Sequence, residues 1–255
     1  MSDKTRVVIG LPSAGLTQVE ALNCLWLQAY HLGAYQKDHP EFEFLFCPRG
    51  RMFTPMNREV IITFAVNAKA DYLFMVDDDM LFKPDLFEQL YRHHVDIVAP
   101  LAFTRNPPHL AVLYQAEKGW DPIEKKEYFN FEWIKNYPRN KLVECDAVGF
   151  GAVLINLKII PRMQRPFFMC SSGTGEDIYF CLKAKEAGAK VFMDTSVILG
   201  HLGAPLVIDQ ETSEKFNEPE FLAKVHGPYR RYEVFDICHQ EAVKDADKQE
   251  VVLAR

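Results

Sequence analysis

The sequence lacks the features that mark zinc-binding, secreted or membrane-spanning proteins. Its six cysteines form no CxxC pair and no Cys/His spacing typical of a zinc site. No signal-peptide core is visible around the first apolar segment, 6–10, and no uninterrupted apolar run approaches the roughly 18 residues of a membrane helix. Without an export signal, reduced cysteines are expected. We therefore expect a soluble, cytoplasmic protein with no transmembrane segment.

A positive net charge is also absent. The chain carries 35 acidic against 29 basic residues, a net charge of −6, which disfavours a whole-surface footprint for nucleic acid. The 255 residues are 48% hydrophobic, enough to bury a full core. We expect one catalytic domain over 1–205, with an extension over 206–255 that packs on this domain or trails from it.

Short apolar runs alternate with amphipathic stretches of helical length through the first hundred residues. This alternation predicts βαβ units around a mostly parallel sheet, and hence an α/β fold. The expected strands are 6–10, 41–47, 71–76 and 95–100. The expected helices are 17–37, 55–69 and 84–94. Pro84 suits the first position of its helix because the missing N–H would be unpaired there anyway.

The second half begins less regularly. Residues 103–141 include Asn106-Pro107-Pro108 and interrupt any clear period, which predicts an irregular insertion with short strands. Regular elements then return, with strands expected at 142–146, 149–156, 190–193 and 196–199 and a helix at 176–187. The polar tail 241–255 predicts a surface helix or a disordered segment.

Three consecutive aspartates, Asp77-Asp78-Asp79, follow the apolar segment 72–76. Carboxylates this close repel one another unless a cation or protons neutralise them. Asp77 and Asp79 can point to one side while Asp78 points away, and Mg²⁺ or Mn²⁺ takes such oxygen ligands. The alternative is a solvated acidic turn or a charge cluster at a helix N-terminus.

Two further elements carry chemistry. In Gly173-Thr174-Gly175-Glu176-Asp177, Thr174 is a candidate helix cap with Asp177 as the capping acid, but a carboxylate here could also accept a proton from an attacking hydroxyl. His201 follows an apolar run, and such a histidine is either structural or a metal ligand.

The order of these motifs resembles GT-A glycosyltransferases. The resemblance covers about residues 5–203 and is closest to family 2-like enzymes and mannan polymerase subunits. The motifs that carry it are Val76-Asp77-Asp78-Asp79-Met80, Val148-Gly149-Phe150-Gly151-Ala152, Gly175-Glu176-Asp177 with Phe180-Cys181, Asp194-Thr195 and His201-Leu202-Gly203. The resemblance implies a Rossmann-like, mixed but mostly parallel sheet flanked by helices.

The resemblance also implies roles for particular residues. Asp77 and Asp79 would bind Mn²⁺ or Mg²⁺ that bridges the diphosphate of a nucleoside-diphosphate sugar, with His201 as the late metal ligand. Asp78 would lie near the ribose or the sugar. Glu176 and Asp177 would lie on the acceptor side, Asp177 as the catalytic base. The segments expected to hold the nucleotide contain Pro12, Ser13, Arg51, Asn57 and Arg58.

The mechanism expected from these roles depends on charge. Negative charge builds on the leaving nucleoside diphosphate while the sugar gains oxocarbenium character, so a metal on the diphosphate stabilises the transition state. With Asp177 as base the product would be inverted, although a retaining enzyme could carry the same metal motif. The acceptor is a hydroxyl on a glycan, a protein, a small molecule or a modified nucleobase. Aromatic and basic residues of the insertion could stack on it: Arg105, His109, Trp120, Trp133 and Arg139.

Other classes stay open. A sugar nucleotidyltransferase would ordinarily have a glycine-rich loop with Arg and Lys after the first strand, where this chain has residues 11–17, LPSAGLT. A metal-dependent phosphohydrolase or nuclease could use paired acids to hold two metals. A nucleotide- or carbohydrate-binding module without turnover is the non-enzymatic alternative.

Overall fold

The computed structural model describes residues 4–15, 17–121, 125–170, 174–203 and 207–216. The strands are β1 (Thr5–Ser13), β2 (Phe42–Gly50), β3 (Tyr72–Val76), β4 (Met80–Leu81), β5 (Ile97–Leu101), β6 (Leu113–Asp121), β7 (Lys126–Trp133), β8 (Leu142–Cys145), β9 (Ala147–Val148), β10 (Ala152–Asn156), β11 (Val191–Ile198), β12 (Gly200–Leu202) and β13 (Val207–Ile208). The helices are α1 (Val19–Asp38), α2 (Thr54–Asn67), α3 (Leu86–Tyr91), α4 (Glu176–Glu186) and α5 (Gln210–Phe216), with a 3₁₀ helix at Leu157–Arg162.

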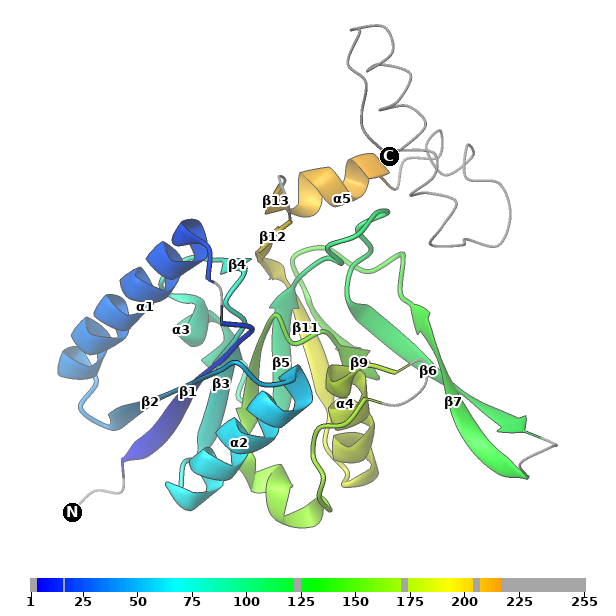
Figure 1. The fold of residues 1–255 in the computed structure, drawn as a ribbon, viewed down its shortest axis with the longest axis horizontal. Coiled ribbons are helices and arrows are strands. Elements are labelled where there is room, and N and C mark those ends of the chain that lie inside the picture. The colour runs from blue at the N-terminus through cyan, green and yellow to red at the C-terminus, as the bar shows by residue number, and fades with distance from the viewer. Residues whose placement is uncertain (1–3, 16, 122–124, 171–173, 204–206, 217–255) are drawn as a thin grey trace, which may run out of the picture.

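A seven-stranded sheet in the order β2-β1-β3-β10-β5-β11-β8 forms the centre of the molecule (Figure 1). The pairs β1–β2, β1–β3 and β5–β11 are parallel. β10 lies antiparallel between β3 and β5, and β8 is an antiparallel edge strand. The predicted α/β fold with a mixed, mostly parallel sheet flanked by helices is confirmed.

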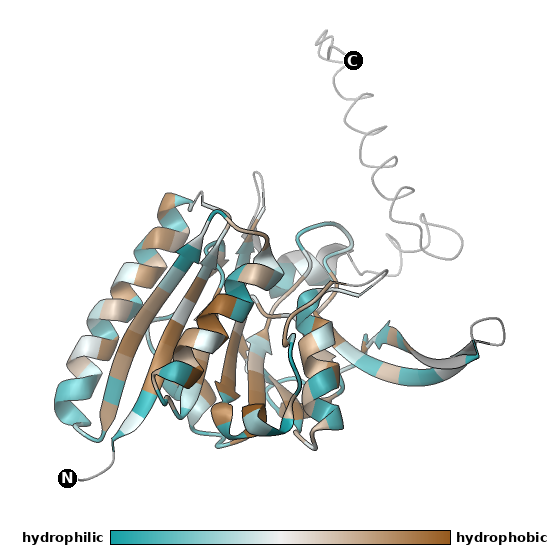
Figure 2. Cartoon of the chain, turned by 60° about the horizontal axis from the view of Figure 1, so that its bottom comes forward, coloured by the Kyte–Doolittle hydropathy of each residue, from teal (hydrophilic) through white to brown (hydrophobic). Residues whose placement is uncertain are grey.

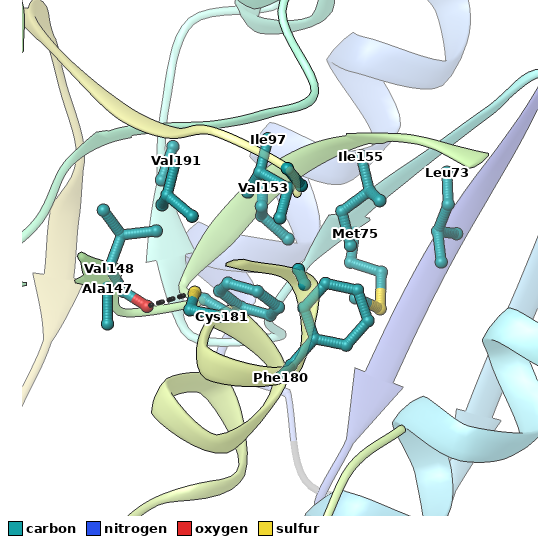
Figure 3. Packing of buried hydrophobic residues seen from close by; sticks show 14 of the residues in the cluster. Leu73, Met75, Ile97, Ala147, Val148, Val153, Ile155, Phe180, Cys181 and Val191 are labelled. Atoms are coloured by element: carbon teal, nitrogen blue, oxygen red, sulfur yellow. Dashed lines mark hydrogen bonds between the residues drawn. The ribbon is translucent and has the colours of Figure 1, made fainter. Parts of the chain in front are cut away.

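Helices cover both faces of this sheet because its buried strands are apolar on both sides (Figures 1 and 2). Val8 and Met75 belong to one core cluster, which includes residues of α2 and α4. Val7 and Phe74 belong to the other, which includes residues of α1 and α3. Figure 3 shows Phe180 and Cys181 of α4 packed among side chains of the first cluster. Because successive side chains of a strand point to opposite faces, each buried strand packs apolar side chains against the helices on both faces.

Most predicted elements exist, but three details were wrong. Pro84 does not begin a helix, since α3 begins at Leu86 after an N-cap at Asp85. The strands expected at 190–193 and 196–199 are the single strand β11, which has a register irregularity after Asp194. The insertion is more regular than expected, because β6 and β7 form an antiparallel hairpin with eight paired positions.

The hairpin extends away from the sheet in both ribbon views (Figures 1 and 2). At its base, β6 pairs with β9, which attaches it to the main body. The start of the C-terminal extension also contacts the insertion. In α5, Ser213 Oγ donates to the His109 carbonyl at 2.5 Å, and Glu214 pairs with Arg139 at 2.7 Å. The tail expected at 241–255 lies outside the described residues.

The described residues include five of the six cysteines. The five cysteines in that part of the chain are free thiols, and Cys47, Cys145 and Cys181 are buried. Within the same residues, no helix combines the length and the apolar character needed to cross a membrane.

Candidate functional site

A cavity of about 360 Å³ opens at the edge of the sheet where β1, β3 and β5 end. Carboxyl ends of parallel strands converge at one edge, where α/β folds commonly bind ligands. Eleven of the residues selected from the sequence line the cavity: Pro12, Ser13, Asn57, Arg58, Asp77, Asp78, Asp79, Arg105, Glu176, Asp177 and His201. Arg51 is not among the lining residues; it is exposed, with φ at 61°.

The three aspartates have three different sets of partners. Asp77 accepts from Arg58, whose Nη2 lies 2.9 Å from both carboxylate oxygens. Asp78 is buried and accepts from the Ser13 hydroxyl at the end of β1. Asp79 pairs with Arg105 and His201. The motif therefore holds the first loop, helix α2 and the late strand β12 around one cavity.

Arg58 organises the buried side of this cluster. Its side chain is only 3% exposed, and besides Asp77 it lies 3.2 Å from Glu176 Oε1 at the start of α4. It also donates to the Phe150 carbonyl at 3.1 Å and packs over the Phe150 ring. Arg58 lines the cavity, and its nucleotide-binding role stays a prediction. One guanidinium thus serves two neighbouring acids.

The turn that carries Phe150 depends on a glycine. A Cβ at Gly149 would lie 2.7 Å from a Val112 methyl carbon, closer than real Cβ atoms come. Glycine therefore lets this turn approach Val112, just before β6, and present the Phe150 carbonyl to Arg58.

Several carboxyl groups lie near the single positive charge of Arg58, and two of them have raised pKa values. Burial raises the pKa of Asp77 to about 7, with Arg58 opposing the shift and the nearby acids adding to it. Burial and the charge of Glu176 also raise the pKa of Asp177, again against Arg58. Three carboxyl groups close to one buried cation favour retention of a proton.

Asp177 does not act with Thr174 as a helix cap. The N-cap of α4 is Gly175, which makes no side-chain cap hydrogen bond, so the Thr174 alternative was wrong. Asp177 Oδ1 accepts from the Ile178 N–H at 2.8 Å within the first turn, and the residue lines the cavity. The carboxyl group is therefore held by the helix start while facing the site.

Asp79 and His201 meet because β4 and β12 pair antiparallel. The ladder places His201 opposite Met80, and Leu202 N donates to the Asp79 carbonyl at 2.9 Å. His201 Nε2 lies 3.4 Å from Asp79 Oδ2. Its Nδ1 lies 2.9 Å from the Phe103 carbonyl, which can only accept, so in the neutral ring Nε2 carries the lone pair.

This pair fits a divalent cation. Asp79 Oδ1 is buried and has no hydrogen-bond partner in the structure. Burial would raise the pKa of Asp79, but the hydrogen bond and charge that a protonated His201 ring supplies, together with the charge of Arg105, hold it below its usual value. A carboxylate and an imidazole fixed by a carbonyl are ordinary metal ligands.

A closed cage of protein ligands is not formed. No group of three or more His, Cys, Asp or Glu residues in the described ranges is placed to hold a metal. Asp77 is engaged by Arg58, so its role as a further ligand stays a prediction. Two protein ligands suffice for a cation that takes its remaining oxygens from phosphate and water.

Arg105 is the site residue whose role the sequence did not reveal. It follows β5 in the insertion and forms an ion pair with Asp79. Its Nε and Nη2 also lie 3.4 Å from His201 Nε2. No motif or spacing marks it, because its place depends on how the loop after β5 folds over the cavity.

The cavity and sheet together define an α/β protein with an acidic site at the carboxyl edge of the sheet. No protein-family model and no curated protein sequence matches the chain. The fold is similar to A197 from STIV, with 18% identity over 80% of this chain and 94% of that chain and a TM-score of 0.50. It is also matched to GalNAc-T7, solved with UDP, GalNAc and Mn²⁺, with 12% identity over 77% of this chain and 43% of that chain and a TM-score of 0.44. At this identity the likeness to A197 shows a shared fold alone.

Proposed function

We propose that the chain is a metal-dependent glycosyltransferase that moves a sugar from a nucleoside-diphosphate sugar to an acceptor hydroxyl. The observation that carries the proposal is the pairing of Asp79 and His201 in the same cavity as Asp177. A cation on this pair and a base at Asp177 would then border one space. The motif order that resembles GT-A enzymes supports the same assignment, and within it the mannan polymerase-like grouping remains part of the proposal.

The donor would lie along the end of β1 and the start of α2. Asn57 is 1% exposed, and its Nδ2 donates to the Ser13 and Met52 carbonyls, both at 3.1 Å. Its Oδ1 is buried without a hydrogen-bond partner and belongs to a residue that lines the cavity. This oxygen is suited to accept from a ribose hydroxyl or a base N–H. Asp78, bonded to Ser13, would lie beside the same part of the donor.

The chemical step needs charge neutralisation and a proton acceptor. The bond from the anomeric carbon to the diphosphate oxygen breaks while the acceptor oxygen forms the new glycosidic bond. Mn²⁺ or Mg²⁺ on Asp79 and His201 would neutralise the charge that builds on the diphosphate. Asp177 would receive the acceptor's proton, and burial, which raises its pKa, makes it a stronger proton acceptor than an ordinary carboxylate.

Release of nucleoside diphosphate from a panel of nucleotide sugars, with and without Mn²⁺, tests the proposal. We expect metal-dependent release that increases with a suitable acceptor and is lost in Asp79→Asn. Formation of nucleoside monophosphate and sugar 1-phosphate instead would indicate a phosphohydrolase. Formation of sugar 1-phosphate and nucleoside triphosphate that requires added pyrophosphate would indicate a nucleotidyltransferase. Binding of nucleotide sugars with no turnover against a broad acceptor panel would indicate a binding module and contradict the proposal.

A further inference from the structure

Arg105 lies where the proposed cation would bind. Its guanidinium contacts Asp79 Oδ2 and approaches His201 Nε2, the carboxylate and the ring nitrogen of the proposed cation site. A guanidinium and a divalent cation on the same two groups would repel each other strongly. Binding of the cation therefore requires the Arg105 side chain to move.

The loop that presents Arg105 is fixed at its base. Phe103 forms a bridge with Ala111, and Thr104 N donates to the Leu110 carbonyl at 2.9 Å. The Thr104 hydroxyl also bonds within the loop, to the Asn106 carbonyl and from Leu110 N. The Arg105 side chain, in contrast, is 54% exposed. It can leave Asp79 by rotation about its own bonds while the backbone stays in place.

The same cavity offers Arg105 a second partner once a donor is bound. Arg105, Asp79 and His201 all line it, so a diphosphate on the cation lies within the space that Arg105 borders. A guanidinium binds phosphate oxygens in a bidentate geometry and is not deprotonated in proteins. Arg105 would thus exchange one anionic partner for a more highly charged one.

We propose that Arg105 is a diphosphate-binding residue that blocks the cation site until the donor arrives, so that cation and donor bind cooperatively. This inference rests on the proposed function and assigns a role to a residue outside the DxD motif. In the empty protein, Arg105 neutralises Asp79. In the loaded protein, it binds the diphosphate.

The test compares Arg105→Gln with wild type, using Mn²⁺ alone and the preformed Mn²⁺–pyrophosphate complex as probes. Free Mn²⁺ is followed by electron paramagnetic resonance and the complex by calorimetry. Arg165→Gln is the matched control, because Arg165 is 53% exposed, pairs with Glu59 and does not line the cavity. Both variants change the net charge equally.

We expect Arg105→Gln to bind Mn²⁺ alone about fivefold more tightly, since an exposed ion pair no longer competes. The same variant should bind the pyrophosphate complex roughly tenfold more weakly, since charge-assisted bonds are lost. Arg165→Gln should match wild type with both probes. Equal Mn²⁺ affinity in wild type and Arg105→Gln, or weaker Mn²⁺ binding in the variant, would overturn the exchange while leaving the proposed cation site intact. Absence of Mn²⁺ binding in both proteins would overturn the proposed cation site itself, and the exchange with it.

Discussion

Two arginines bind different aspartates of the motif, and they differ in burial. Arg58 is 3% exposed and reaches Asp77, Glu176 and the Phe150 carbonyl. Arg105 is 54% exposed and bonds to Asp79 and His201. A buried charge that loses its partner incurs a large desolvation penalty, whereas an exposed one returns to water. Arg58 is therefore a fixed part of the fold, and Arg105 is free to change partners.

Removing Arg58 should produce the largest effect. Arg58→Met keeps much of the side-chain volume but leaves Asp77 and Glu176 without their cation, and we expect a loss of about 3–5 kcal/mol in unfolding free energy. The matched change Arg105→Met should cost no more than about 1 kcal/mol. Urea denaturation of both variants in chelator measures the difference. Equal losses of unfolding free energy would mean that burial does not make Arg58 more important for stability than Arg105.

A substitution of Asp177 tests the chemical step, in the part of the cavity that Arg58 borders. Asp177→Asn should lower transfer by about 10²-fold or more, because the proton acceptor is lost, while nucleotide and metal affinities stay nearly unchanged. Turnover at saturating donor and acceptor, with melting measured on the same sample, provides the readout. Wild-type turnover in the variant would contradict the assignment of Asp177 as base.

Substitutions of Asp79 and His201, the two partners of Arg105, should change the affinity for metal. We expect Asp79→Asn and His201→Ala each to weaken Mn²⁺ binding about tenfold or more, since each removes one of two protein ligands. Both groups are near the cavity surface, so the folded domain should persist. Asp78→Asn is the control, because Asp78 bonds to Ser13 instead. Unchanged Mn²⁺ affinity in folded His201→Ala would make this histidine structural.

A pH dependence of stability is expected from Asp77, which Arg58 contacts directly. Its folded pKa of about 7 lies above its ordinary value of 3.8, so the folded state binds the proton more tightly. The resulting stabilisation is present below about pH 4 and is lost as pH rises through 7. In chelator, Asp77→Asn should lose less stability than wild type between pH 5 and pH 8. Identical pH slopes in urea denaturation would show that Asp77 does not carry this proton.

The sequence revealed the elements that depend on local pattern. Buried strands such as β3 and the acids that follow it are visible as an apolar run broken by charge, and the carboxyl-edge rule brings them to one cavity. His201 was a candidate ligand from the resemblance, and the pairing of β12 with β4 explains its position. Strand order and strand ends explain the positions of these residues, while their roles stay predictions.

The partners of the arginines were not predictable in the same way. Arg58 lies on a helix and Arg105 in an insertion, and each finds its carboxylate only after distant segments have packed. Nothing in their neighbours in the sequence distinguishes a nucleotide-binding arginine from one that binds the protein. The regular hairpin of β6 and β7 was missed for a related reason, since its cross-strand pairs stabilise a segment without a clear apolar period.

The central position of β10 has a consequence for how the chain acquires its structure. β10 joins β3 to β5, yet residues 152–156 are made long after both neighbours. In a nascent chain that ends before residue 152, a partial sheet of β2-β1-β3 would have an open apolar edge at β3, and β5 would have no strand that joins it to this sheet. Such edges pair readily with other chains. The central sheet therefore cannot be completed until the antiparallel strand β10 has been synthesised. Fragments that end before β10 should aggregate during synthesis.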